Sequence, residues 1–446
     1  MEITPNPAFA DEPVRVAASG FAPRQRVIVR ASTEDDAGRR WVSHAEFRAD
    51  AEGCVDAAAQ KSLGGSYRGL SPMGLLWSMR IEPQHDRGDT IFVKNDSTPQ
   101  AVRFEVEAGG VAKGTRTTAA TLERQFLAAG TETRDLTIGE SGETCAGRLF
   151  LPAASAAQRP LPAVMVLNGS GGGFDLDKAA LLSRHGFATL ALAYFGAPPL
   201  PPWLHRIPLE YFDAALTWLA GQPEIASERI GVIGVSRGAE LALLLGSMFP
   251  QIRAVAAYAP SHVAWAAGGR DRESGEIIPS WTWQEKPVLF APLPLRGFML
   301  RSAVPVVALR RPVVFRNLFR AGLRHRAAVE RAEIAVERIN GPILLVSGGD
   351  DHVWPAAKMS EAIVARLKAK RYADHVEHLH FPRAGHMLRY PYLPTTSRRS
   401  RNRHLRNARY SFGGIAAADA EAQASAWLRT ISFFRDALGA GGGPSE

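Results

Sequence analysis

Cysteine is scarce in this sequence, with Cys54 and Cys145 the two present among 446 residues. Two cysteines cannot build the disulfide framework of a small secreted domain or a cysteine-rich metal site. Neither has a context that favours reactivity, so both are interpreted as small core side chains. The scarcity favours a reducing compartment. We expect a cytoplasmic protein with no metal and no cofactor.

Long hydrophobic runs are also missing. No apolar stretch approaches the roughly 20 residues that a membrane-spanning helix requires, so we expect no membrane span. The first five residues, MEITP, include an acidic side chain where a secretory or transit peptide is basic, which argues against export. The content of 46% hydrophobic and 22% charged residues is ordinary for a globular protein. Because one domain usually holds roughly 100 to 200 residues, this length predicts two domains.

Basic residues are in excess, with a formal net charge of +9. They cluster between Arg296 and Arg338 and again between Arg398 and Arg406. Such clusters favour an anionic partner, whether nucleic acid, a membrane surface or a phosphate-bearing substrate. They are equally compatible with a face that is simply solvated. The charge alone does not choose between these readings.

The first part of the chain has the pattern of an all-β domain. Up to about Glu107, short runs that alternate apolar and polar residues are separated by turn residues, as in a β-sandwich. The expected strands include Val14–Val16, Arg26–Arg30, Leu75–Met79 and Val102–Val106. Gly, Ala and Thr then mark a linker, and Thr121–Leu127 is expected to begin a short helix. We therefore predict an immunoglobulin-like sandwich domain with its linker at residues 1–120.

After this point the pattern changes to strands that alternate with helices. Alternating elements of this kind indicate an α/β domain, a mostly parallel sheet covered by helices on both faces, which we place at 121–446. The residues from about 268 to 340 do not follow this alternation and are rich in proline and arginine. We interpret them as a cap inserted over the strand ends, where such folds build binding sites. The expected strands are 163–167, 188–193, 230–233, 255–258, 343–346 and 378–381.

The strongest local signal is the pattern G-x-S-x-G at Gly234 to Gly238, with Ser236 at its centre. A short β-branched run precedes it and a helical apolar pattern follows it, as in a nucleophile elbow. The turn is tight, so side chains at the two glycines would meet the neighbouring strand or helix. A serine hydroxyl is a poor nucleophile alone and requires a base and an acid later in the chain.

Both required groups follow in the order typical of this architecture, which is Ser, Asp, His. Asp351 comes just after one expected strand and His386 just after the next. His386 would accept the proton of Ser236, and Asp351 would orient the imidazole and stabilise its cation. Asp350 is an alternative for the acid. Taken singly, each of these residues is also explained by turn geometry, and the order and placement favour a triad.

An oxyanion hole is expected from the backbone N–H of Arg237 and from the loop Asn168–Gly173, where Gly169, Ser170 and Gly171 are the candidates. The alternative for this glycine-rich loop is a phosphate cradle. It lacks the Lys-Ser/Thr ending of a P-loop, which counts against that alternative.

With these residues placed, the chain resembles the acyl-CoA thioesterase and bile acid-CoA:amino acid N-acyltransferase family over nearly its whole length. The segments that carry the resemblance are ITPNP from Ile3, NGSGGG from Asn168, ALAY from Ala191, PLEYF from Pro208, GVSRGAE from Gly234, GPILL from Gly341, GDDHVW from Gly349, Gly385-His386 and PYLP from Pro391. The resemblance implies that Ser236, Asp351 and His386 match the triad positions and that the substrate is an acyl thioester of coenzyme A. The acyltransferase branch has cysteine at the nucleophile position. Serine there favours hydrolysis over acyl transfer.

By this resemblance the expected protein is a serine hydrolase that binds a small-molecule acyl-CoA and no nucleic acid. Apolar residues of the cap would line an acyl site, and its arginines would meet the coenzyme A phosphates. Two other readings stay open within enzymes: a carboxylesterase or dienelactone-hydrolase-like enzyme on oxygen esters, and the N-acyltransferase. A non-enzymatic module that binds an anionic ligand is the third, and it predicts salt-dependent binding that survives loss of Ser236. Acyl chain length, the specific substrate-binding residues and oligomeric state are not indicated by the sequence.

Overall fold

The computed structural model describes residues 1–85, 91–108, 117–137, 144–153, 159–303, 311–402 and 408–439. Contacts within the chain divide it into two compact units. The first unit holds Met1–Leu127 and two later segments, Arg389–Arg409 and Ile415–Ala424. The second holds the rest of the chain.

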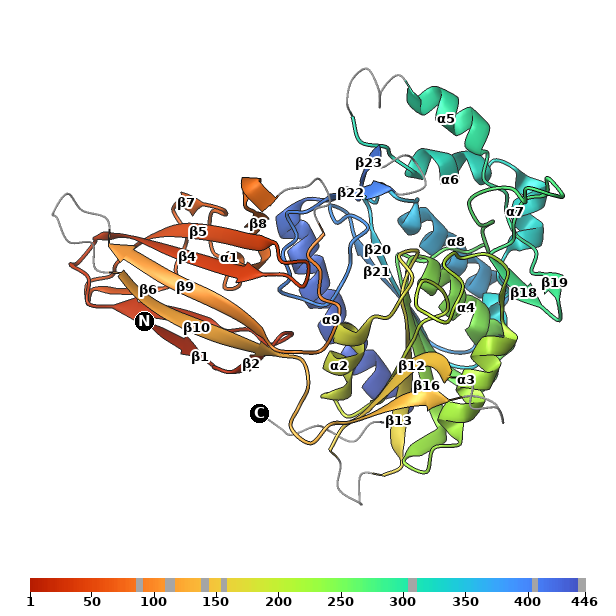
Figure 1. Ribbon diagram of the computed structural model, residues 1–446, viewed down its shortest axis with the longest axis horizontal. Helices are drawn as coiled ribbons and strands as arrows, with labels where there is room; N and C mark the ends of the chain where they lie inside the picture. The colour runs from red at the N-terminus through yellow and green to blue at the C-terminus, as the bar shows by residue number, and fades with distance from the viewer. Residues whose placement is uncertain are drawn as a thin grey trace. The chain divides into compact units, whose positions relative to one another are not determined.

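The first unit is built from mostly antiparallel strands, as the alternating pattern predicts, with β2 and β10 the parallel pair (Figure 1). In β4 (Arg26–Glu34) and β5 (Arg40–Arg48), every second side chain is buried, because successive residues of a strand point to opposite faces. The central side chains of this core include the fully buried Trp41, Phe47 and Phe104. One sheet has the order β1 (Glu2–Thr4), β3 (Arg15–Ser19), β6 (Cys54–Asp56); the other has β2 (Ala8–Phe9), β10 (Thr117–Gln125), β9 (Gln100–Ala108), β4, β5, β7 (Gly64–Gly65), with β8 (Arg80–Ile81) also paired to β5.

The end of this unit differs from the expectation. Residues 117–125 form β10, which pairs antiparallel with β9 from Thr117 to Arg124. The prediction of a short helix at Thr121–Leu127 is therefore wrong. This strand crosses the expected domain boundary at 120/121, and the first unit continues to Leu127. The expected linker lies partly at 109–116, outside the described residues.

The second unit contains an eight-stranded sheet whose central strands are parallel. The first two strands of this sheet form an antiparallel hairpin, and the other six run parallel to one another. The strand order is β11 (Glu132–Thr137), β12 (Thr144–Leu151), β14 (Ala188–Leu192), β13 (Leu161–Leu167), β16 (Ile225–Val235), β17 (Ile252–Tyr258), β20 (Ile343–Gly348), β21 (Val376–Phe381). All six strands expected from the sequence are present.

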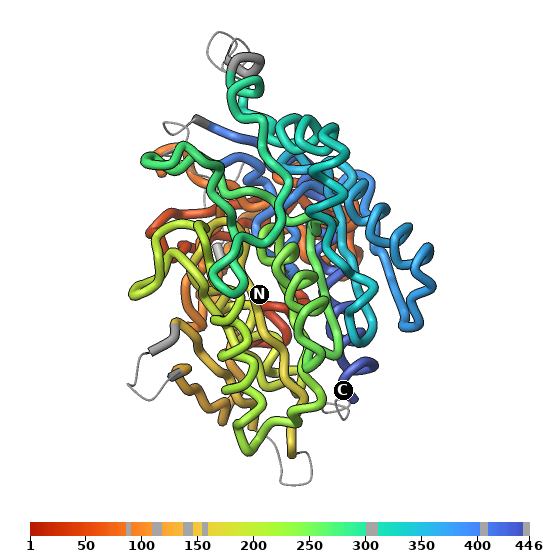
Figure 2. The backbone as a smooth tube through the Cα atoms, turned by 90° about the vertical axis from the view of Figure 1, so that its right-hand side faces the viewer, coloured from red at the N-terminus to blue at the C-terminus, as the bar shows by residue number. Residues whose placement is uncertain are grey.

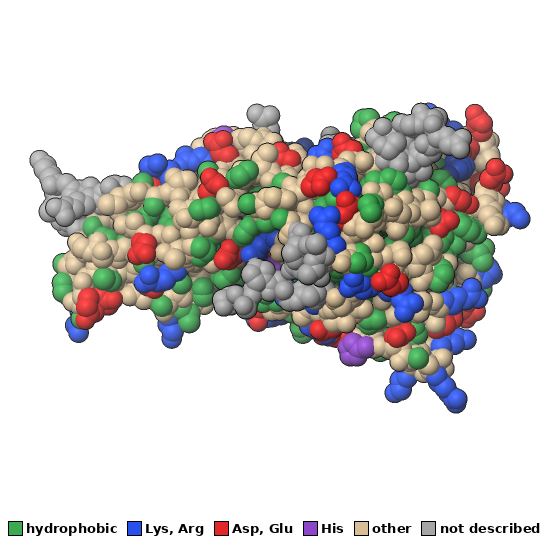
Figure 3. Space-filling model, turned by 90° about the horizontal axis from the view of Figure 1, so that it is seen from below, with side chains coloured by type: hydrophobic (Ala, Val, Ile, Leu, Met, Phe, Trp, Pro, Cys, Tyr) green, Lys and Arg blue, Asp and Glu red, His purple; other side chains and the backbone are tan. Residues whose placement is uncertain are grey.

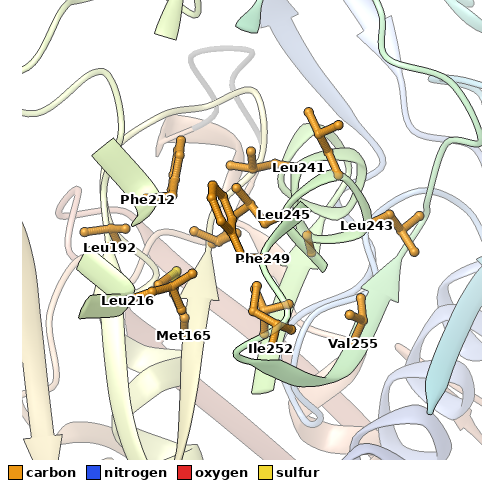
Figure 4. Close-up of a cluster of buried hydrophobic side chains, with 14 of the residues drawn as sticks. Met165, Leu192, Phe212, Leu216, Leu241, Leu243, Leu245, Phe249, Ile252 and Val255 are labelled. Atoms are coloured by element: carbon orange, nitrogen blue, oxygen red, sulfur yellow. The ribbon is translucent and has the colours of Figure 1, made fainter. Parts of the chain in front are cut away.

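Helices cover both faces of this sheet. On one face, α3 (Glu210–Ala220), α4 (Arg237–Met248) and α8 (Ala356–Ala369) pack into one apolar core with the strands (Figure 4). On the other face, α9 (Ala416–Leu438) brings Phe434 against Phe187 and against Gly231 of β16, and α2 (Leu176–Ser183) lies against β14. Gly231 faces α9 while its neighbour Val232 belongs to the α3/α4 core, as strand alternation requires. This arrangement confirms the predicted α/β-hydrolase fold.

The segment between β17 and β20 is the largest departure from regular alternation, and we call residues 268–340 the inserted segment. It contains β18 (Trp281–Trp283), β19 (Lys286–Pro287), α5 (Leu295–Ala303), α6 (Arg316–Gly322) and α7 (Arg326–Ala332). Figures 1 and 2 show α5 and α6 side by side. β18 pairs with β15 (Ile207–Pro208), which ties this segment to the beginning of α3. Its role as a cap remains a prediction.

Basic side chains do not form one continuous surface on the face drawn in Figure 3, where Lys and Arg lie among Asp and Glu. Among the described helices, none combines the length and the hydropathy needed to cross a membrane.

Candidate active site

Ser236 lies at the junction of β16 and α4, with backbone angles of φ 57° and ψ −120°. These angles are strained for a residue with a side chain and turn the chain sharply from the strand into the helix. The Ser236 backbone N–H donates to the carbonyl of Tyr258 at the end of β17, at 2.8 Å. The serine carbonyl accepts the N–H groups of Ala239 and Glu240 and so begins α4. The strained turn is therefore held on both sides.

The two glycines of the motif are required by close packing. A Cβ at Gly238 would collide with the carbonyl oxygen of Asn168 and would lie 2.7 Å from that of Leu167. A Cβ at Gly234 would collide with the Gly238 carbonyl. The expectation that side chains at these positions would meet neighbouring elements is thus confirmed.

The structure brings Ser236, Asp351 and His386 together, although they come from three separate loops. His386 Nε2 is 3.0 Å from Ser236 Oγ, and His386 Nδ1 is 2.7 Å from Asp351 Oδ2. All three residues are buried, with 7%, 1% and 5% of their surface exposed for Ser236, Asp351 and His386. Burial strengthens these hydrogen bonds because little water competes for the partners. The arrangement matches a nucleophile, a base and an orienting acid.

The two candidate acids differ in what they contact. The second oxygen of Asp351 accepts the N–H groups of Val353 at 2.7 Å and Trp354 at 3.1 Å. These donors fix the carboxylate so that Oδ2 points at His386. Asp350 instead lies 3.1 Å from His352 Nε2 and accepts the N–H of Gly414. Geometry therefore favours Asp351 over Asp350 for the acid role.

A segment around Phe412, for which nothing was predicted from the sequence, links the loop of Asp351 to His386. The Phe412 carbonyl accepts the N–H of His386 at 2.9 Å and the N–H of His352 at 3.2 Å. The Phe412 ring lies parallel to the His386 imidazole, with centroids 6.4 Å apart. Gly413 has a φ of 77°, and a Cβ there would collide with the Asp350 carbonyl. In the sequence, the adjacent glycines Gly413 and Gly414 were the available signal of a tight turn. The loop of Asp350 that this turn packs against is far away in the chain, so the contact could not be predicted.

The loop after β13 lies against the serine. A Cβ at Gly169 would come 3.3 Å from Ser236 Cβ. The Asn168 side chain shapes this loop, donating to the Gly172 carbonyl at 2.8 Å and accepting the Gly169 N–H at 2.7 Å. Tyr194 donates its hydroxyl to the Asn168 carbonyl at 2.6 Å, and burial raises the pKa of this tyrosine above its usual value.

Of the four expected oxyanion donors, Gly169 already has an acceptor in Asn168. Hydrogen bonds in the described chain leave the N–H groups of Ser170, Gly171 and Arg237 available. Arg237 is the first residue of α4, where backbone N–H groups have no partner within the helix. Free donors beside a nucleophile are what an oxyanion hole requires.

The Arg237 side chain turns away from the serine into a buried polar network. It forms an ion pair with Glu240 at 2.8 Å and donates to the carbonyl of Trp265 at 3.0 Å and to Ser280 Oγ. Glu240 also accepts the Trp281 indole N–H at 2.8 Å. Burial raises the pKa of Glu240 to about 6, and the charge of Arg237 opposes this rise. The network ties the start of α4 to the strand β18 and the chain that precedes it.

The described residues include no group of three or more His, Cys, Asp or Glu side chains placed to hold a metal ion.

Comparison with known proteins matches both parts of the chain. Residues 207–440 match the model of the BAAT/acyl-CoA thioester hydrolase C-terminal region, and residues 11–138 match that of the acyl-CoA thioester hydrolase/BAAT N-terminal region. Acyl-coenzyme A thioesterase 1 of Mus musculus is 35% identical over 96% of this chain and 94% of its own length. Peroxisomal succinyl-coenzyme A thioesterase of Mus musculus is 33% identical with the same coverage. Mitochondrial acyl-coenzyme A thioesterase 2 of Homo sapiens is 33% identical over 96% of this chain and 82% of its own.

Proposed function

We propose a mechanism from the premise that this chain belongs to the acyl-CoA thioester hydrolase/BAAT family, as both halves of the sequence show. The chain is an acyl-CoA thioesterase, which cleaves acyl-CoA to a free acid and coenzyme A. Ser236 is the nucleophile, His386 the general base and Asp351 the orienting acid. The observation that carries this proposal is the continuous path of hydrogen bonds from Asp351 through His386 to Ser236.

In the first step, Ser236 Oγ attacks the thioester carbonyl carbon while its proton moves to His386 Nε2. Negative charge builds on the carbonyl oxygen, and the N–H groups of Arg237 and of Ser170 or Gly171 stabilise it. The C–S bond then breaks and coenzyme A leaves as its thiolate. A thiolate leaves readily because the pKa of a thiol is far below that of an alcohol. The thiolate then takes up the proton held on His386, so coenzyme A is released as its thiol and the histidine is neutral again.

In the second step, His386 removes a proton from water as the water oxygen attacks the acyl-serine ester. The bond between the acyl carbon and Ser236 Oγ breaks, and His386 returns the proton to the serine. Asp351 keeps Nδ1 protonated throughout, so that Nε2 of the neutral ring faces Ser236. The acid product and the free enzyme result.

The test is thiol release from a panel of acyl-CoA substrates, short, long and branched, by the wild type and by Ser236→Ala. We expect the variant to lose at least about 10³-fold in kcat, because the nucleophile is removed. An oxygen ester of the same acyl group serves as the comparison substrate. Faster cleavage of the ester than of the thioester would replace the thioesterase assignment with an esterase of the same triad. Equal thiol release by both proteins would overturn the role of Ser236.

Transfer to an amino acid is tested in the same assay by adding glycine or taurine. We expect free acid as the product in their presence, since the nucleophile is serine. Formation of an N-acyl amino acid would instead assign the acyltransferase activity.

For the compartment we propose the cytoplasm. Cys54 is a free cysteine, as a reducing environment allows. Two of the relatives above carry the words peroxisomal and mitochondrial in their names, so location varies among related proteins. Fractionation of cells that express the natural protein decides the question, and recovery with an organelle or membrane would refute the cytoplasmic placement.

A further inference from the structure

The helix α6 of the inserted segment has an apolar side that reaches the catalytic histidine through aromatic contacts. Leu318 is buried, and the Phe319 ring lies 4.9 Å from that of Trp265 and 5.4 Å from that of Trp354. The Trp354 ring lies in turn 6.0 Å from His386. α6 is therefore packed one aromatic layer away from the base.

The beginning of α6 is also joined to the loop that carries the triad acid. The Arg316 N–H donates to the carbonyl of His352 at 2.9 Å, one residue after Asp351. The Arg316 guanidinium lies 3.7 Å from Asp350. These bonds fix the position of α6 relative to the active site.

Three arginines follow one another along α6 and its end. Arg316 and Arg320 are four residues apart in α6, so they project from the same side of the helix, and Arg324 follows four residues later in the turn after the helix. Arg320 and Arg324 are exposed. Partial burial lowers the pKa of Arg320, and the like charge of Arg316 nearby lowers it as well.

The charge of this arginine row is poorly neutralised. Among the ion pairs of the described residues, Asp350 is the carboxylate that approaches the row, and its distance of 3.7 Å from Arg316 is long. The Arg316 Nε is buried without a hydrogen-bond partner. Some arginines elsewhere in the unit are paired closely, as Arg366 is with Glu337 at 2.6 Å and Arg134 with Glu224 at 2.7 Å. Guanidinium groups without carboxylate partners favour binding of an anion, and their geometry suits phosphate.

We propose that the row Arg316, Arg320 and Arg324 binds the phosphate groups of the coenzyme A part of the substrate. The inference rests on the proposed function. An acyl-CoA is apolar at one end and carries a pyrophosphate and a 3′-phosphate at the other. α6 offers a match for both ends, an apolar face packed toward His386 and a cationic face formed by the arginine row. Nucleic acid or an acidic membrane would use the cationic face alone and would leave its attachment to the active-site loop unexplained.

The test compares three thioesters of one acyl group: acyl-CoA, acyl-dephospho-CoA and S-acyl-pantetheine. Each is assayed with the wild type and with the double variant Arg320→Ala/Arg324→Ala. We expect the variant to raise KM for acyl-CoA by about 10- to 30-fold, since two charge-assisted phosphate contacts are lost, with kcat little changed. S-acyl-pantetheine has no phosphate, so its kcat/KM is expected to be the same in both proteins. The dephospho substrate shows whether the 3′-phosphate or the pyrophosphate is bound.

The matched control is Arg253→Ala, an exposed arginine at the amino end of β17, the opposite edge of the sheet from the serine. We expect its KM for all three substrates to equal that of the wild type. An unchanged KM for acyl-CoA in the double variant overturns the proposal. An equal loss with S-acyl-pantetheine does so too, because it would indicate structural damage.

Calorimetric binding of free coenzyme A to the same proteins keeps this inference separate from the proposed function. If the wild type released no thiol at all, weaker coenzyme A binding by the double variant would still support the arginine row while the thioesterase mechanism failed. Binding of duplex DNA that depends on the row, without binding of coenzyme A, would replace the ligand with nucleic acid and overturn the proposal.

Discussion

Asp350 and Asp351 are neighbours in the sequence, yet one carboxylate faces His386 and the other faces His352. We predict that Asp351→Asn lowers kcat by about 10³- to 10⁴-fold. The amide keeps the shape of the side chain, but it no longer holds the required tautomer or stabilises the histidine cation. Steady-state thiol release measures the effect.

Asp350→Asn is the control for this substitution. It removes a partly exposed ion pair, and pairs of that kind contribute little, so we expect kcat within about fivefold of the wild type. A larger loss at 350 than at 351 would assign the acid role to Asp350 and refute the geometric argument.

His262 provides a second prediction at this scale, on stability. Its Nδ1 is buried without a partner, and burial lowers the pKa of the imidazole to about 4. The unfolded chain binds a proton near pH 6.5, whereas the folded chain resists it. The stability contributed by the neutral ring is therefore present above pH 6.5 and is lost as the pH falls toward 4. We expect the wild type to lose about 3 kcal/mol more than His262→Gln between pH 7 and pH 4.

Urea unfolding of both proteins at several pH values in this range measures that difference. An equal loss of stability in the two proteins would contradict this prediction, because it would show that the folded chain protonates His262 as readily as the unfolded chain does.

At the scale of single residues, the sequence was sufficient to bring Ser236, His386 and a pair of candidate acids to one place. Each follows a strand of the parallel sheet, and parallel strands end at one edge of a sheet. The sequence could not choose between Asp350 and Asp351, because the choice depends on N–H groups of Val353 and Trp354. It also gave no sign of the Phe412 carbonyl or of the partners of Glu240, since those contacts join segments far apart in the chain.

Among the elements, the turn between β16 and α4 has little tolerance for added volume. We predict that Gly238→Ala destabilises the protein by about 1 to 3 kcal/mol, because its Cβ would meet two carbonyl oxygens of the β13 loop, and backbone cannot move aside cheaply. The same displacement would shift the oxyanion donors, so kcat should fall as well. Denaturant midpoints and thiol release report the two effects.

Gly268→Ala is the matched control, since a Cβ at that glycine would have open space around it. Its stability is expected to equal that of the wild type within about 0.5 kcal/mol. A stable and fully active Gly238→Ala would show that the turn is looser than these contacts indicate.

Element types were predictable where an apolar run was long and buried, and less so elsewhere. Among the six parallel strands, β13, β14 and β20 have near-continuous apolar sequences, which is typical of strands covered on both faces. Leu75–Met79 was expected to be a strand, but Gly74–Trp77 forms the short helix α1, because a run this short does not distinguish the two periods. The last helix, α9, begins at Ala416, and Asp419 lies in its first turn.

For the whole molecule, the formal net charge of +9 bears on how an anionic substrate arrives. We predict that kcat/KM for acyl-CoA falls by about tenfold between low salt and 0.5 M salt, because the attraction is screened over shorter distances. S-acyl-pantetheine lacks the phosphates and should show no such dependence. An equal salt response for both substrates would point to an effect of salt on the protein itself.

The course of the chain between the two compact units has a consequence for how this protein can change over evolutionary time. A domain that occupies one continuous stretch can be gained, lost or exchanged by a single rearrangement of the gene. Here the chain passes from one unit to the other at 127–128, 388–389, 409–410, 414–415 and 424–425. Along the chain, Tyr410–Gly414 of the second unit stand between two segments of the first unit, Arg389–Arg409 and Ile415–Ala424. Removal of the first unit by one deletion would therefore leave parts of it in the remaining chain, so we expect the two units to be inherited together.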